Sequence, residues 1–76
     1  MKSRRELVLK NNIKAIREEK GYSQVEFAKM CGTTQTTISA IETDRYSPTA
    51  YLSAIIVAVL DKKWEEVFYL DEKPKK

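Results

Sequence analysis

The sequence predicts one small all-α domain of four to five short helices. Apolar residues recur at spacings of three and four, as in Ile13 with Ile16 and Ile38 with Ile41, which places each pair on one face of a helix. Residues that typically start or stop helices separate these segments. With 76 residues, 42% of them hydrophobic and 33% charged, the chain is long enough for a single modest core.

The first half of the chain reads as an arm followed by two helices. Residues 1–10 comprise a basic arm and a short apolar run, Leu7–Leu9, which could be a strand or the first turn of a helix. Residues 11–20 form the first expected helix, capped by Asn11 or Asn12 and stopped by Gly21. Residues 23–30 form the second, because Ser23 and Glu26 make a capping box. Its inner face is expected to hold Phe27, Ala28 and Cys31, the cysteine as a plain core residue.

Residues 33–41 are harder to assign, because four threonines and two isoleucines favour a strand locally. We predict a helix capped by Thr34, since Ile38 and Ile41 fit helical spacing and no neighbouring segment offers a strong pairing strand. Residues 43–48 are then a loop, with Asp44 at a turn and Pro48 blocking any helix through it.

The rest of the chain predicts two more helices and a possible ribbon. Thr49 caps a helix over residues 50–60, and a polar break at residues 61–63 precedes a short fifth helix over residues 64–68. Phe68–Leu70 could be extended and could pair with Val8 and Leu9 as a small antiparallel ribbon of the two ends. Residues 71–76 are expected to be a frayed, charged tail, so the domain proper would span residues 11–70.

Composition excludes several kinds of site. The chain has no histidine, one cysteine and two glycines, which rules out histidine-based metal and catalytic sites, a disulfide within the chain, and glycine-rich phosphate loops. The adjacent carboxylates Glu18–Glu19 and Glu65–Glu66 imply no catalytic pocket, so we expect no enzyme. The longest apolar stretch is about half of a membrane span, and no long apolar stretch follows the N-terminal charges. We therefore expect a cytoplasmic protein with no metal, cofactor, membrane contact or evident small-molecule substrate.

One spacing points to a function: Ala28, Gly32, Ile38 and Ile41 fit two helices that cross over a tight turn. Ala28 is small where the second helix passes, Gly32 can take the positive φ of the turn, and the isoleucines face the core. No charge occurs from Met30 to Ile41 in a chain with a net charge of +3. Such an uncharged polar surface suits the reading of base edges in double-stranded DNA. The outward face comprises Gln35, Thr36, Ser39 and Ala40.

The run from Ser23 to Glu42 resembles the helix-turn-helix of the Cro and repressor proteins of lambdoid phages and of the wide Xre-type group of regulators. The resemblance extends from about Asn11 to Phe68 and implies a lambda-repressor-like fold. It implies base reading by Gln35, Thr36 and Ala40, to which we add Ser39. It also implies an internal salt bridge between Arg17 and Glu42, which would link the first helix to the third. The residues expected to contact the DNA backbone are Gln24, Thr34, Thr37, Thr43 and Arg45.

The sequence departs from this family mainly in its loops. Asp44 and Asp61 stand where glycine is common, Val25 replaces a polar or acidic residue, and Lys62–Lys63 replace an apolar residue and a cap. The basic arm of Lys2, Arg4 and Arg5 is equally compatible with a disordered segment and with a contact to phosphates or the minor groove.

The helix over residues 50–60 is apolar nearly all round, which a surface helix should not be. Four of its residues can fill the core, namely Leu52, Ile56, Val59 and Leu60. Tyr51 and Ile55 then remain for a subunit interface, with Trp64 as an anchor, unless the helix is simply buried within one domain. We expect a homodimeric repressor on a palindromic operator. An antitoxin that also binds DNA, and a protein-interaction module on the same fold, are the alternatives.

Overall fold

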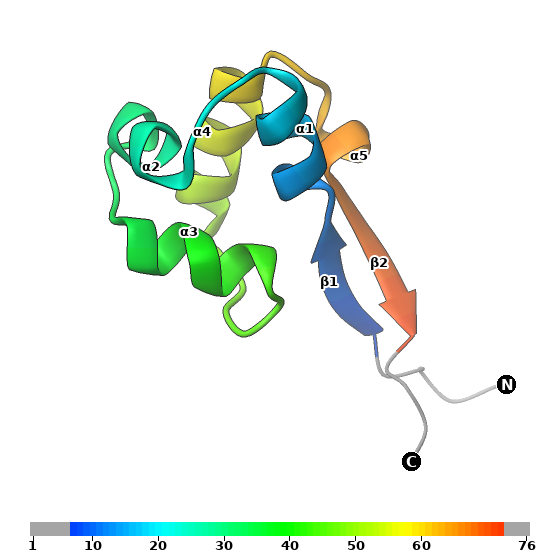
Figure 1. Ribbon diagram of the computed structural model, residues 1–76. Helices are drawn as coiled ribbons and strands as arrows, with labels where there is room; N and C mark the ends of the chain where they lie inside the picture. Colours follow the sequence, from blue (N-terminus) through cyan, green and yellow to red (C-terminus); the bar gives the residue numbers. More distant parts are fainter. Residues whose placement is uncertain (1–6, 73–76) are drawn as a thin grey trace, which may run out of the picture.

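Five helices and one antiparallel pair of strands make up residues 7–72, the part of the chain that the computed structural model describes (Figure 1). Their order is β1 (Leu7–Asn11), α1 (Ile13–Glu19), α2 (Gln24–Cys31), α3 (Gln35–Glu42), α4 (Ala50–Leu60), α5 (Trp64–Val67) and β2 (Phe68–Glu72). The prediction of a mostly helical domain with a terminal ribbon is therefore confirmed. The basic arm residues Lys2, Arg4 and Arg5 lie outside the described residues, as do residues 73–76.

Side-chain caps start three of the helices, as the sequence predicts. Ser23 Oγ accepts a hydrogen bond from the Glu26 amide at 3.0 Å, and Glu26 Oε1 accepts one from the Ser23 amide at 2.9 Å. Thr34 and Thr49 accept from the amides three residues further on. At α1 the cap is different: Asn12 occupies the N-cap position without a side-chain bond, and Asn11 Oδ1 accepts from the Ile13 amide instead.

Helix ends differ from the predicted bounds where extended capping residues lie outside the helix. Thr34, with φ −109° and ψ 157°, caps α3, which begins at Gln35 as predicted, whereas Ser23, with φ −76° and ψ 166°, lies outside α2, which begins at Gln24 and not at residue 23. Four residues adopt a positive φ at turns: Gly21, Gly32, Asp44 and Asp61. The two aspartates stand at the positions where the resembling family commonly has glycine, and they take the same left-handed conformation, which aspartate tolerates better than most residues.

The core lies between the helices and includes residues from every helix and from β2. Ile38 and Ile41 of α3 are buried, as are Phe27, Ala28 and Cys31 of α2. In α4 the buried face comprises Ser53, Ile56 and Leu60, whereas Leu52 and Val59, which were expected in the core, are only partly buried against it. Ser53 shares a helix face with Ile56 and Leu60 at spacings of three and four, so its position and not its polarity decides its burial.

The two ends of the chain form a ribbon that extends away from the helices (Figure 1). Strand β1 pairs antiparallel with β2 from Leu7 opposite Glu72 to Asn11 opposite Phe68. The ribbon is longer than predicted, because Asp71 and Glu72, expected in a frayed tail, continue β2. Asn12 also donates its amide to Val67 O at 2.8 Å, which ties the ribbon to the start of α1. Among the described residues, none of the helices reaches the length and apolar character of a bilayer span.

Candidate nucleic-acid interface

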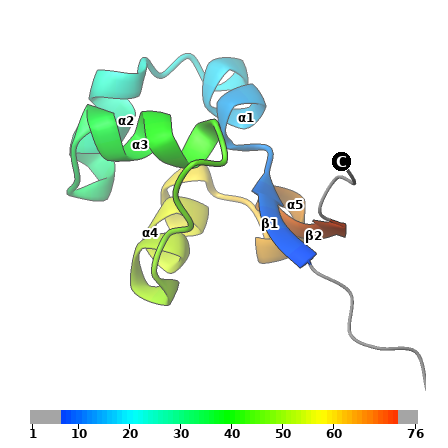
Figure 2. The ribbon, with the colours of Figure 1, turned by 90° about the horizontal axis from the view of Figure 1, so that it is seen from below.

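Helix α3 turns two isoleucines inward and a polar face outward. Ile38 and Ile41 are buried, Gln35 and Thr36 are exposed, and Ser39 and Ala40 are half-exposed. In the view from below, α2 and α3 lie side by side, and α4 is drawn below α3 (Figure 2). The uncharged surface of α3 is thus held outward by its own core residues and by its contact with α2.

The turn between α2 and α3 has the geometry that the spacing predicts. Gly32 ends α2 with φ 73° and ψ 31°, and its amide points at the last-turn carbonyls of Ala28 and Lys29. Thr33 donates its amide to Ala28 O at 2.9 Å, which closes the turn. Ala28 is 2% exposed. The turn is therefore tight, and it leaves Thr34 free to cap α3.

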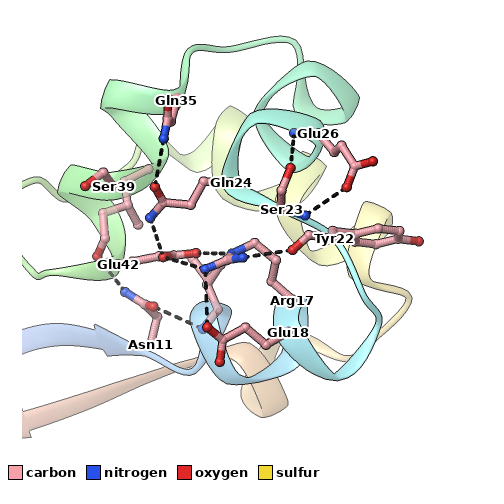
Figure 3. Close-up of polar contacts among 12 residues, drawn as sticks. Asn11, Arg17, Glu18, Tyr22, Ser23, Gln24, Glu26, Gln35, Ser39 and Glu42 are labelled. Atoms are coloured by element: carbon pink, nitrogen blue, oxygen red, sulfur yellow. Dashed lines mark hydrogen bonds and ion pairs between the residues drawn. The ribbon is translucent and has the colours of Figure 1, made fainter.

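A buried ion pair joins α1 to the end of α3. Arg17 Nε donates to Glu42 Oε2 at 2.7 Å and Nη2 donates to Glu42 Oε1 at 3.3 Å, while Nη1 donates to Tyr22 O at 2.8 Å (Figure 3). The two side chains are 7% and 1% exposed. The hydrogen bond to Glu42 raises the pKa of the Arg17 guanidinium, against a smaller opposing effect of burial. Arg17 thus stays charged and anchors the end of α3.

The ion pair continues through two glutamines to the outward face of α3 (Figure 3). Gln24 Nε2 donates to Glu42 Oε1 at 2.9 Å, and Gln35 Nε2 donates to Gln24 Oε1 at 3.2 Å. Because a carboxylate can only accept, it orients the Gln24 amide with its oxygen toward Gln35. Gln35 keeps its own carbonyl oxygen and a second N–H for other partners. We call these four residues the Arg17–Gln35 network.

The loop after α3 is fixed by bonds to the helix and to the ribbon. Thr43 Oγ1 donates to Ser39 O at 2.8 Å, and Arg45 Nε donates to Thr43 Oγ1 at 3.1 Å. Asn11 Nδ2 donates to Ile41 O at 2.9 Å. Sequence reasoning considered Asn11 only as a helix cap and missed this second contact, because its partner lies 30 residues away and no local pattern marks it.

The loop also contains an ion pair that the sequence did not reveal. Lys10 Nζ lies 3.4 Å from Asp44 Oδ2, so strand β1 neutralises the aspartate of the loop. Together with the bond from Asn11, this pair fixes the position of the loop relative to the ribbon.

An open hollow of about 230 Å³ lies on this surface. Its lining comes from α2, from α3 and from the loop that follows α3. All five lining residues were expected to contact DNA, either its bases or its backbone: Gln24, Gln35, Thr36, Ser39 and Arg45. The two remaining expected backbone contacts on α3, Thr34 and Thr37, hydrogen bond to each other at the start of the helix at 3.0 Å.

The residues expected at a subunit interface lie on α4 and α5. Tyr51 is 78% exposed and Ile55, one turn further along α4, is partly buried. Trp64 is 45% exposed and packs its ring against Phe68, with the centroids 4.6 Å apart. Cys31 is a free, buried thiol whose pKa is raised to about 11 by burial. The described residues contain no group of three potential metal ligands.

A tight glycine turn, a buried pair of isoleucines and an outward polar helix define a helix-turn-helix DNA-binding domain. A helix-turn-helix family model (HTH_3) matches residues 13–67. The chain belongs to this family, the Cro/C1-type or Xre-type helix-turn-helix transcriptional regulators, which are not enzymes.

Two relatives support the same assignment. The chain is 38% identical over 64 residues to the uncharacterized HTH-type transcriptional regulator YgzD of Bacillus subtilis. The aligned region covers 84% of this chain and 97% of the relative. It is 41% identical over 61 residues to an HTH-type transcriptional regulator of Methanothermobacter thermautotrophicus, covering 79% and 88%.

Solved structures show the same fold. A Bacteroides fragilis protein named as a candidate DNA-binding protein superposes with a TM-score of 0.73 over 82% of this chain and all of that one, at 19% identity. The hypothetical transcription factor NHTF from Neisseria superposes with a TM-score of 0.67 at 31% identity, over 72% of this chain and 63% of the other.

Proposed function

We propose that this regulator is a repressor that binds a palindromic operator as a homodimer, with α3 of each subunit in the major groove. The observation that carries the proposal is the outward face of α3, where Gln35 keeps an acceptor and a donor free while its amide is oriented by Gln24. A carboxamide with both groups available can form two hydrogen bonds to the edge of an adenine. Thr36, Ser39 and Ala40 complete the base-reading surface.

The residues around this surface suit contacts to the DNA backbone. Helix α3 has an uncharged first turn, and the positive end of its dipole lies at this N-terminus, so a phosphate is favoured near Thr34 and Thr37. Gln24 at the start of α2, and Thr43 and Arg45 in the loop, border the same surface. Contacts of this kind set the register of a protein on DNA, while base contacts set the sequence.

The experiment is selection of bound sequences from a random DNA pool, followed by affinity measurements with Gln35→Ala. We expect this variant to lose about 1–3 kcal/mol on the selected site and to relax the preference at one base position. Ala15→Ser, an exposed change on α1, is the matched control and should bind as the wild type does. If Gln35→Ala binds the selected site with unchanged affinity, the readout assignment is wrong.

A second copy of the chain is the partner that α4 favours. Tyr51 and Ile55 lie one turn apart on α4, and two-fold dimers of helix-turn-helix domains bind half-sites about one turn of DNA apart. Trp64 would anchor the interface from α5. Such a dimer reads an inverted repeat, and a repeat that overlaps a promoter would exclude polymerase. Expression from a reporter with the selected site at its promoter should therefore fall.

Analytical ultracentrifugation tests the dimer. Ile55→Asp and Tyr51→Lys should both sediment as monomers, because each places a charge in the interface. Tyr51→Lys removes no core contact, so loss of folding cannot account for its result. Ala50→Asp adds the same charge to a different face of α4, at the helix N-terminus where an acid is favourable, and should remain a dimer. A dimer that survives both interface changes would refute this surface.

A further inference from the structure

Arg45 lies on the base-reading side of the domain. It lines the same hollow as Gln35, Thr36 and Ser39, the residues of the outward face of α3. The resemblance to Cro and repressor proteins implies only a backbone contact for the loop in which it stands. Because Arg45 lines the hollow, its positive charge lies beside the outward face of α3. No residue from Met30 to Ile41 is charged.

The side chain of Arg45 is held at its inner end and unpaired at its outer end. Its Nε donates to Thr43 Oγ1, and that hydroxyl donates to Ser39 O, so the stem is tied to the last turn of α3. Among residues 7–72, nothing accepts a hydrogen bond from its two terminal nitrogens. The guanidinium therefore presents a fork of donors with its stem already fixed.

The neighbouring carboxylates are committed elsewhere. Asp44, adjacent in the sequence, pairs with Lys10. Glu42 is buried and accepts from Arg17 and Gln24. Neither carboxylate forms an ion pair with Arg45, so its charge and its terminal donors remain available to a ligand.

We propose that Arg45 reads a base edge, the two acceptors O6 and N7 of a guanine, beside the base that Gln35 reads. A guanidinium fork matches these two acceptors, and a carboxamide matches the edge of an adenine. Arg45 and Gln35, which line the same hollow, would therefore recognise two different bases. The inference rests on the proposed function, because it requires α3 to face the major groove. It assigns Arg45 to sequence recognition and not to uniform attraction for the backbone.

The test compares two variants that each remove one positive charge. Arg45→Ala removes the proposed reader, and Lys29→Ala removes an exposed cation at the last turn of α2 that does not line the hollow. Each variant and the wild type select sequences from a random pool, and their affinities are then measured at two salt concentrations. We expect Arg45→Ala to lose preference for guanine at one position of each half-site, by roughly 10- to 100-fold, with the other positions unchanged.

Lys29→Ala should instead weaken binding to all sequences alike and reduce the salt dependence of affinity. If Arg45→Ala behaves in this way too, with an unchanged motif, Arg45 contacts phosphate and the proposal is refuted while the proposed function stands. If the wild type itself enriches no motif, the proposed function fails, and the assignment of Arg45 to base reading fails with it.

Discussion

Removing either partner of the Arg17–Glu42 pair should destabilise the domain severely. In Arg17→Met the Glu42 carboxylate stays in place with a side chain only 1% exposed, and Gln24 remains as its one donor among the described residues. In Glu42→Leu the guanidinium keeps Tyr22 O and an exposed Glu18 oxygen 4.0 Å away, which offer little compensation. A buried charge left without its partner costs about 3–5 kcal/mol.

That cost is a large share of the total stability. At about 0.05–0.15 kcal/mol per residue, a chain of this length has a free energy of unfolding of roughly 4–11 kcal/mol. Each single variant is therefore expected to lose between about a quarter and all of the stability of the domain. The double variant Arg17→Met with Glu42→Leu buries no charge, and we expect it to recover most of the loss, to within about 2 kcal/mol of the wild type.

Urea unfolding measures both effects, with circular dichroism for the helices and the fluorescence of Trp64, the single tryptophan, as a second probe. With these figures the double-mutant cycle should give a coupling energy of about 4 kcal/mol or more. A coupling energy near zero, or single variants that lose less than about 1 kcal/mol, would show that water solvates the pair and that its burial does not matter.

Three other predictions follow from single sites. Gly32→Ala should lower the free energy of unfolding by about 1–2 kcal/mol. The cost comes from its φ of 73° alone, because no atom lies within 4 Å of the added Cβ. Gly21→Ala, where φ is 83° and no atom lies within 4 Å either, should cost the same. Asn11→Ala should cost about 1–3 kcal/mol, because two hydrogen bonds of Asn11 are lost, one to Ile41 O and one from the Ile13 amide; Ile41 O keeps the amide of Asp44 as a donor, and a smaller loss in urea unfolding would mean that water replaces Asn11. Burial raises the pKa of Cys31 to about 11, so a thiol reagent at pH 8 should label it only through unfolding.

The raised pKa of Cys31 also determines whether the stability of the domain rises or falls with pH. The thiol pKa is higher in the folded protein than the ordinary value of 9.0, so the folded state holds this proton more tightly. Its contribution to stability is complete below pH 9 and is lost as the pH rises toward about 11. Labelling of native Cys31 that keeps pace with a free thiol at pH 8 would contradict the burial.

Sequence reasoning succeeded where one residue or a short spacing determines the local structure. The capping box of Ser23 and Glu26 needs only two side chains three residues apart, and Gly32 needs only its missing Cβ. The burial of Ile38 and Ile41 follows from helical periodicity, which outweighed the strand preference of the threonines around them. These features fix the helix-turn-helix, and so most of the fold.

The contacts that sequence reasoning missed join residues distant in the chain. Asn11 and Lys10 reach Ile41 O and Asp44 across 30 and 34 residues, and nothing in their neighbours marks these partners. The orientation of Gln24 was likewise invisible, because it depends on Glu42 being buried 18 residues away. The continuation of β2 through Asp71 was missed because strand pairing, not local charge, decides where a ribbon ends.

The Arg17–Gln35 network makes stability and DNA reading separable in one variant. In Arg17→Met with Glu42→Leu, Gln24 Nε2 loses the carboxylate that holds it, so the Gln24 amide can turn over and present Gln35 with a donor in place of an acceptor. We therefore expect this variant to be folded in urea titrations and yet to bind its selected site about ten-fold more weakly. Its affinity for random DNA should not change, because no surface charge has been altered. If the folded double variant binds the selected site as tightly as the wild type, the network stabilises the domain but does not position Gln35.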